Sequence, residues 1–406
     1  MASNGQLKLL TNLLNIPEVK VIDFVKESSL GNIFIVENLN EAATCPHCGK
    51  ISHHLHQNHW YLIKDLPMNG KLVYLKIQRR QFKCKNCSKT FSEPLSYCEP
   101  NRHYTKRLAL DIISQVKHSN IKSVAQRTGV TEAEIETMLK DLKKNLASQK
   151  PQGLKRLGID EISHAKGQGN YCAVLVDLDR GKLLALVPER TQEAIEKVLL
   201  SWGEEVLSSI VEVSMDLWRP YQSLMKKLMP DTDIVADRFH VMQQVQEELN
   251  NQRKLVKKEV QKMAKSPEKT AKLNAINKSK FALLKNPENL NEAQKIKREE
   301  VKQHFPILAE MCGLKEEFRQ IFESSKNWFD GLIKLGRWLK KSAALFPKSQ
   351  GTIRRWLVEI TAYFESRTSN GVVEGVNQKI KLVKRSGFGF RNLENLELRC
   401  LLAFED

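Results

Sequence analysis

The sequence predicts a multidomain α+β protein, and three observations lead to that class. Two CxxC pairs lie among short strand-like runs within residues 1–100. Apolar residues at helical spacing follow over residues 104–146. Beyond residue 151, strand and helix signals alternate, and then a strand-free helical stretch fills residues 242–364. Because 406 residues exceed one ordinary core, these changes of pattern predict separate domains.

The charge of the chain points to a polyanionic partner. Its 65 Lys and Arg against 47 Asp and Glu give a formal net charge of +18. Such an excess is typical of proteins that bind nucleic acid. The sequence has no apolar run long enough to cross a bilayer, and its first residues do not have the form of a secretory signal. We therefore expect a soluble, intracellular protein that does not bind membranes.

The two CxxC pairs predict a structural zinc site. Cys45 and Cys48 form one pair, and Cys84 and Cys87 form the other. Each pair offers two thiolates from one tight turn, so two pairs complete the tetrahedral set that Zn²⁺ prefers. The alternative is four free structural cysteines. Four histidines between the pairs could also be ligands, although solvated strand positions are the favoured reading: His53, His54, His56 and His59.

The helical segment that follows resembles a helix-turn-helix. In SVAQRTGVTEAEIETMLKDL, Gly129 occupies the turn. Glu132, Glu134 and Glu136 on the second helix would repel phosphate, so a plain packing role is the alternative to groove binding. Neighbouring basic residues are the better candidates for phosphate contacts: Arg79, Arg80, Arg102, Lys106 and Arg107.

After the linker KPQG at 150–153, the expected order is βββαβαβ, with a Gly-rich turn after the first strand. The first strand carries Asp160 and Glu161, which cannot face one site because side chains alternate along a strand. Asp216 ends the apolar strand IVEVSMD, and strand ends are where open sheets build sites.

A third carboxylate lies on the last long helix, near residues 371–384. Glu374, Asn377, Lys381 and Arg385 recur along one stripe of this helix. An adjoining apolar stripe would pack on the sheet: Val373, Val376, Ile380 and Val383. Carboxylates from two strands and one helix could together hold two hard cations, Mg²⁺ or Mn²⁺, for phosphodiester chemistry.

These motifs together resemble the bacterial insertion-sequence transposases of the ISL3 family. The resemblance rests on CPHC with CKNCSKTF, GIDE at 158–161, MDLWRPY at 215–221, IVADRFHV at 234–241 and TSNGVVEGVNQKIKLVKRSGFGFRN at 368–392. It implies a zinc ribbon, a helix-turn-helix and an RNase H-like mixed α/β core interrupted by an all-helical insertion. The implied limits are a zinc-ribbon DNA-binding domain at 1–100, a helix-turn-helix domain at 101–150, a core at 151–241 and 365–406, and an insertion at 242–364.

The resemblance also implies roles for individual residues. Asp160, Asp216 and Glu374 would be the catalytic, metal-binding triad, with Asp237 as the rival second acid. Glu359 and Glu365 are weaker rivals for the third acid. Asp237 and His240 match a D-x-x-H signature that supports the site. Asn377 and Lys381 would support it as well, and Lys381 and Arg385 would also contact DNA.

The implied activity is transposition. The enzyme would bind the terminal inverted repeats of its element, cut them with metal help and join them to target DNA. Its partners would be double-stranded transposon ends and target DNA, with a dimer or larger assembly when two ends are paired, in the cytoplasm at the nucleoid. Trp328, Trp338 or Trp356 could stack on an unpaired base, or simply pack in the core. The alternatives are a noncatalytic sequence-specific DNA-binding regulator and an RNase H-like structure-selective nuclease.

Overall fold

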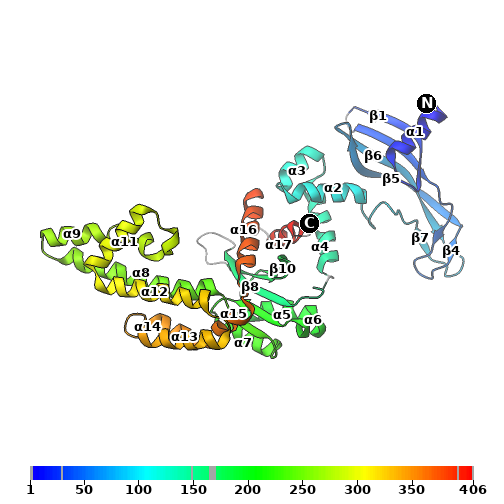
Figure 1. Cartoon of the computed structure of the whole chain (residues 1–406). Helices are drawn as coiled ribbons and strands as arrows, with labels where there is room; N and C mark the ends of the chain where they lie inside the picture. The colour runs from blue at the N-terminus through cyan, green and yellow to red at the C-terminus, as the bar shows by residue number, and fades with distance from the viewer. Residues whose placement is uncertain (1–2, 29–30, 148–149, 164–170, 391–392, 405–406) are drawn as a thin grey trace. The chain divides into compact units, whose positions relative to one another are not determined.

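The computed structural model describes residues 3–28, 31–147, 150–163, 171–390 and 393–404 (Figure 1). The chain forms two compact units. The first comprises residues 1–149 and 382–403, and the second comprises residues 150–381 and 404–406. The predicted Gly-rich turn at 164–170 lies outside the described residues. No helix in the described ranges has the length and apolar character needed to span a bilayer.

A five-stranded sheet forms the first part of the first unit. Its order is β1-β2-β6-β5, with β7 also paired to β6. The bounds are β1 Val19–Glu27, β2 Gly31–Asn38, β5 Leu55–Met68, β6 Lys71–Lys83 and β7 Thr90–Ser92. The helix α1 (Asn4–Leu14) adds Leu14 to the core on one face of this sheet. Two short strands, β3 (Ala43–Thr44) and β4 (Ile51–Ser52), flank the first CxxC pair.

Three helices form the predicted helix-turn-helix: α2 (Lys106–Lys117), α3 (Ile121–Thr128) and α4 (Glu132–Ala147). Asn120 caps α3 by accepting a hydrogen bond from the Ser123 N–H at 2.8 Å. Gly129 ends α3 with φ of +67°, a left-handed conformation that glycine adopts without a steric cost. The helix-turn-helix expected from the sequence is therefore confirmed.

The last helix, α17 (Leu393–Ala403), packs with α2 and α4. Leu398 and Leu402 are each 2% exposed within the apolar cluster of the three helices. Arg399 donates to the Ser119 carbonyl at 2.6 Å. α17 therefore buries its apolar face within the first unit.

A second five-stranded sheet is the centre of the second unit. Its order is β10-β9-β8-β11-β12. The bounds are β8 Arg156–Ser163, β9 Tyr171–Asp177, β10 Lys182–Val187, β11 Glu212–Met215 and β12 Asp233–Ala236. β8, β9 and β10 pair antiparallel, whereas β11 is parallel to both β8 and β12. This topology confirms the expected RNase H-like mixed α/β core.

Helices join and cover these strands. α5 (Gln192–Trp202) and α6 (Glu204–Ser209) connect β10 to β11, and α7 (Arg219–Leu228) connects β11 to β12. α16 (Gly371–Ser386) buries Val373, Val376 and Ile380, as its apolar stripe predicted. Val373 lies one turn before Asn377, beside the stripe of predicted site residues.

The insertion between β12 and α16 is entirely helical over residues 238–366, all of which the structure describes. Its bounds are α8 Arg238–Lys262, α9 Pro267–Ile276, α10 Lys280–Leu284, η1 Pro287–Asn289, α11 Glu292–His304, α12 Pro306–Ser324, α13 Trp328–Lys341, α14 Pro347–Arg355 and α15 Leu357–Ser366. α8 and α12 lie side by side (Figure 1). α8 begins at Arg238 because Asp237 caps it.

The insertion contains a buried charge network. Lys315 is fully buried on α12, and its Nζ donates to the carbonyls of Leu283, Leu284 and Lys285 at 3.0, 3.1 and 3.2 Å. The same Nζ lies 2.7 Å from Oε1 of Glu316. One lysine therefore satisfies the C-terminal carbonyls of α10, which would otherwise be buried without donors.

Candidate active site and metal centre

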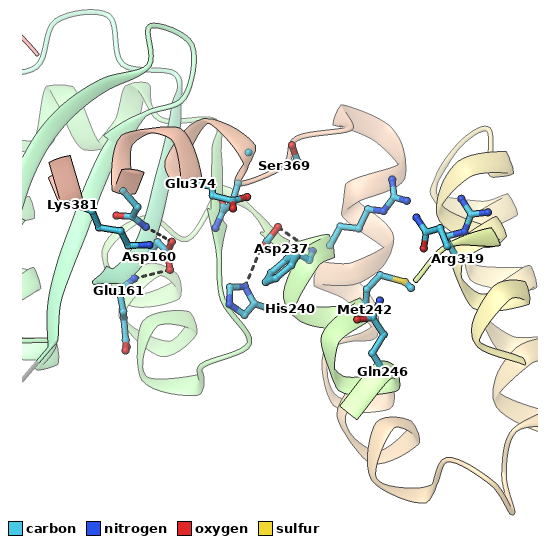
Figure 2. A pocket seen from close by; sticks show the side chains of 16 residues that line it. Asp160, Glu161, Asp237, His240, Met242, Gln246, Arg319, Ser369, Glu374 and Lys381 are labelled. Carbon is cyan, nitrogen blue, oxygen red and sulfur yellow. Dashed lines mark hydrogen bonds and ion pairs between the residues drawn. The ribbon is translucent and has the colours of Figure 1, made fainter. Parts of the chain in front are cut away.

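Three aspartates reach the same level across three neighbouring parallel strands. Ile159 of β8 pairs with Met215 of β11, which pairs with Ala236 of β12. The next residue along each strand is Asp160, Asp216 or Asp237. The parallel register of these strands therefore brings together three carboxylates that lie up to 77 positions apart in the sequence, from Asp160 to Asp237. Figure 2 shows Asp160 and Asp237 facing the same cavity.

His240 joins two of these carboxylates. Its Nδ1 lies 2.7 Å from Oδ1 of Asp216 and 2.8 Å from Oδ2 of Asp237. Asp237 also accepts the Phe239 N–H at 3.3 Å, which fixes the first turn of α8. Burial lowers the pKa of His240, but the hydrogen bonds and charges of the two aspartates outweigh it and raise the pKa to about 10. The two carboxylates therefore favour the protonated form of the imidazole.

Asp160 is held by a residue of α16. Asn377 Nδ2 donates to its Oδ2 at 2.6 Å, and the Glu161 N–H donates to its Oδ1 at 2.7 Å. Burial, followed by the nearby charge of Asp216, raises the pKa of Asp160 to about 6. Glu161 has separate partners, since its carboxylate accepts from Arg190 at 2.8 Å and from the Tyr221 hydroxyl at 3.3 Å.

Gly158 permits the close approach of α16 to β8. A Cβ at this position would lie 2.6 Å from Cγ2 of Val373 and 2.7 Å from Cδ2 of Leu178. Carbon atoms prefer separations of about 3.5–4.0 Å, so a side chain would push the helix from the strand. Gly158 and Asp160 share one face of the strand, and Val373 and Asn377 share one face of the helix. The glycine thus sets the distance at which Asn377 meets Asp160.

The site opens into a cavity of about 510 Å³ within the second unit. Six predicted site residues line it: Asp160, Asp237, His240, Glu374, Asn377 and Lys381. Glu374 is exposed and projects from α16 (Figure 2). Asp216 is not among the lining residues and reaches the cavity wall through His240. Among the described residues, the ligand atoms of Asp216, Asp237 and His240 lie within 4.8 Å of one another, whereas Asp160 and Glu374 lie outside that set.

The donor atoms fit a hard divalent cation. Carboxylate and amide oxygens are the ligands that Mg²⁺ prefers. Asn377 Oδ1 is buried without a hydrogen-bond donor among the described residues, whereas Asp216 Oδ1 lies 2.7 Å from His240 Nδ1. Buried acceptors of this kind are costly unless something else binds them. Burial and the nearby carboxylate of Asp216 raise the pKa of Asp160 because both disfavour its negative charge. A bound cation would offset both effects.

The four cysteines of the CxxC pairs form a second cluster. Their sulfurs lie within 4.8 Å of one another, with Cys45 and Cys87 3.7 Å apart and Cys48 and Cys84 3.5 Å apart. A backbone hydrogen bond from Lys50 leads the effects that lower the pKa of Cys48 to about 6. Four thiolates at this spacing fit a closed tetrahedral Zn²⁺ site. The four intervening histidines are exposed and lie outside the cluster.

Comparison with known proteins agrees with this arrangement. The model of the ISL3 transposase family, described as "Transposase", matches residues 157–400. The chain belongs to the ISL3 family of transposases. Models for the zinc finger of the IS204/IS1001/IS1096/IS1165 transposases and for the helix-turn-helix domain of the ISL3 family match residues 41–87 and 93–142.

Two curated relatives are similar over much of the chain. The transposase for IS1001 of Bordetella parapertussis is 25% identical over 370 residues, which cover 89% of this chain and 88% of that protein. The transposase for IS1557 of Mycobacterium tuberculosis is 30% identical over 262 residues, which cover 60% of this chain and 58% of that protein.

Most of the basic residues expected to contact phosphate are paired within the first unit of the transposase. Arg80 binds Glu93 at 2.7 Å, Arg102 binds Asp141 at 2.7 Å, and Arg107 binds the buried Asp65. These three arginines therefore have structural partners.

The remaining basic candidates differ in setting. Arg79 donates to the Glu93 carbonyl at 3.0 Å and lies over the Tyr61 ring. Lys106 is half exposed, 3.6 Å from Glu99. Lys381 lines the cavity, and Arg385 lies in the last turn of α16. Glu134, which the sequence suggested would repel phosphate, is neutralised by Lys64 at 2.7 Å.

Sequence reasoning missed the wall of the cavity that the insertion supplies. Phe239, Met242 and Gln246 line it from α8, and Asn286 and Arg319 line it from later segments. Figure 2 shows Met242, Gln246 and Arg319 on this side. The positions 239, 242 and 246 recur at i, i+3 and i+7, a spacing that places them on one helical face and that the sequence already contained.

Proposed function

We propose that this transposase binds the terminal inverted repeats of its insertion sequence and catalyses metal-dependent DNA strand cleavage and strand transfer. The observation that carries the proposal is the alignment of Asp160, Asp216 and Asp237 across parallel strands, with Glu374 on the helix that packs against them. Such a group of oxygen donors beside a cavity is suited to phosphodiester chemistry.

Each residue has a proposed role. Asp160, Asp216 and Glu374 would hold two Mg²⁺ or Mn²⁺ ions, with Asp237 as the rival second acid. Bound divalent ions supply Lewis acidity to the attacking and leaving oxygens of an in-line displacement. Asn377 orients Asp160, and His240 Nδ1 joins Asp216 and Asp237 and holds their carboxylates in place. Lys381, at the cavity wall, offers a positive charge to a DNA phosphate.

The first unit would deliver the DNA ends. In this proposal the zinc ribbon and the helix-turn-helix bind the double-stranded repeats, while target DNA meets the core. Pairing of two ends would require two or more protomers, acting at the nucleoid. One structural Zn²⁺ would hold Cys45, Cys48, Cys84 and Cys87 together. The high positive charge of the chain supports binding to a polyanion.

A cleavage assay on the repeats that flank the gene tests the proposal. With Mg²⁺ or Mn²⁺, we expect the wild-type protein to nick the repeat and to join the cut end to a second DNA. Asp160→Asn and Asp216→Asn should each lower the cleavage rate by at least about 1,000-fold. The reason is that the loss of one group from a cooperating catalytic set abolishes most of the rate enhancement. Binding measured by gel shift should stay within about twofold. Asp233→Asn, an exposed aspartate at the start of β12, is the matched control and should cut normally.

The same assay separates the alternatives. Binding without any cleavage would support the noncatalytic regulator, and cleavage without joined products would support the structure-selective nuclease. If Asp216→Asn cuts at the wild-type rate while Asp237→Asn is inactive, the second acid is Asp237.

A further inference from the structure

The face of α8 that lines the cavity carries an exposed aromatic residue, Phe239. Phe239, Met242 and Gln246 line the cavity, while Val241, Val245 and Leu249 of the same helix are buried in the core. An amphipathic helix places polar side chains on the face opposite its core. Phe239 departs from that pattern, because this apolar residue is 64% exposed. It lies two positions after Asp237, the N-cap of α8.

The ring of Phe239 is fixed on one side and open on the other. It makes an edge contact with the His240 ring, with centroids 5.4 Å apart and planes at 87°. His240 is in turn held by Asp216 and Asp237. An aromatic surface is therefore anchored beside the carboxylates and exposed to the cavity.

Two amides lie in the same cavity without partners. The side chains of Gln246 on α8 and Asn286 at the start of η1 line it and have no hydrogen bond to any residue that the structure describes. Each side-chain amide offers two N–H donors and one carbonyl acceptor, and nucleobase edges carry complementary donors and acceptors. Phe239 and Gln246 are seven positions apart on the helix, which is about 10 Å along its axis, or about three steps of stacked bases.

We propose that this wall is a subsite for unpaired nucleotides of the DNA strand at the cleavage site. Phe239 stacks on one unpaired base, and the amides of Gln246 and Asn286 bind the edges of that base or the next. The inference rests on the proposed function, because DNA is the substrate that brings flat aromatic rings to this cavity. Stacking on an aromatic side chain tolerates any base, so the subsite would hold the strand without reading its sequence.

The tryptophans considered from the sequence are less suitable. Trp338 is 1% exposed, and its Nε1 donates to the Leu314 carbonyl at 2.8 Å, so it belongs to the core of the insertion. Trp356 is 4% exposed. Trp328 is exposed at the start of α13 but is not among the residues that line the cavity.

A binding experiment on the full chain tests the subsite without cleavage. The probes are two fluorescent forked duplexes, one with a four-thymidine single-stranded tail and one with four abasic sites in the same tail, measured by anisotropy without divalent ions. Because both probes have equal charge, their affinity ratio reports contacts to bases. We expect the wild-type protein to prefer the thymidine fork by roughly 5- to 100-fold.

Three variants give the result its meaning. Phe239→Ala should abolish the preference, and Phe239→Trp should keep it. Phe281→Ala removes a phenylalanine that is 58% exposed on α10 outside the cavity lining, and it should leave the preference unchanged. Thermal unfolding should show that all three variants remain folded, as expected for exposed side chains.

The outcomes distinguish this inference from the proposed function. Equal binding of the two forks by the wild-type protein, or an undiminished preference in Phe239→Ala, would overturn the subsite even if the repeats are cut. Conversely, loss of the preference in Phe239→Ala with no cleavage of the repeats in Mg²⁺ or Mn²⁺ would support the subsite and contradict the catalytic proposal.

Discussion

Replacement of Gly158 by alanine should displace α16 and weaken the site without touching any carboxylate. The added Cβ would lie 2.6 Å from Val373 and 2.7 Å from Leu178, so α16 must move by about 1 Å and the Leu178 side chain must also shift to restore ordinary contacts. Overpacking of this size costs about 1–3 kcal/mol. Alanine in a strand regains about 0.5–1 kcal/mol relative to glycine. The expected net loss in the free energy of unfolding therefore lies between about 0 and 2.5 kcal/mol, with a central value of about 1 kcal/mol.

The effect on activity should exceed the effect on stability. Val373 and Asn377 lie one turn apart on α16, so a retreat of the helix lengthens the 2.6 Å hydrogen bond between Asn377 and Asp160. A misplacement of about 1 Å can lower a catalytic rate by up to about 100-fold. Urea unfolding would measure the stability of Gly158→Ala, and the initial rate of repeat cleavage would measure its activity.

A compensating substitution makes the test specific. Val373→Ala removes the methyl group that the new Cβ would meet, so the double variant should recover stability relative to the sum of the single changes, with a coupling energy of about 1 kcal/mol or more. Gly313→Ala on α12 is the matched control, since its Cβ would meet nothing within 4 Å. If Gly158→Ala unfolds within 0.5 kcal/mol of wild type, cuts at the normal rate and shows no coupling to Val373→Ala, the proposed spacing role is wrong.

Three further predictions concern the metal cluster and the insertion. Cys87→Ala should reduce the bound zinc of the purified protein from about one equivalent to near zero by mass spectrometry, because three thiolates no longer close the tetrahedron; unchanged zinc would contradict the cluster. Lys315→Met should lower the free energy of unfolding by about 2–4 kcal/mol in urea, because three buried carbonyls and Glu316 lose a donor. Burial raises the pKa of Glu316, but the hydrogen bond from Lys315 and the nearby cations lower it below its ordinary value. Its stabilisation is thus present above the ordinary carboxyl pKa and is lost as the pH falls through the lowered pKa, so Tm should fall more steeply in acid for wild type than for Lys315→Met.

The sequence predicted those features that depend on local pattern. The CxxC spacing predicted the sulfur cluster, and the alternation of strand and helix signals predicted the β8 to β12 order. The choice between Asp216 and Asp237 stays open for a physical reason. Both follow neighbouring parallel strands in register, so both occur at the same level beside His240.

The sequence did not predict which element packs against a given buried or exposed face. The apolar pattern of α17 shows that one face is buried, but it does not say that Leu398 and Leu402 pack with the helix-turn-helix. Likewise, Phe239 reads as an ordinary apolar residue in an amphipathic helix until the structure shows that it lines the cavity. Periodicity identifies a face, whereas only tertiary packing identifies what that face meets.

The position of α17 has a consequence for synthesis on the ribosome. Helices α2 to α4 are translated early, yet the apolar cluster that they share with Leu398 and Leu402 closes only after about 250 further residues have been made. At about 5–20 residues per second, this delay lasts on the order of 10–50 s. A nascent chain that stops within the insertion would therefore leave the helix-turn-helix with an open apolar surface, and such a surface makes an incomplete chain prone to aggregation.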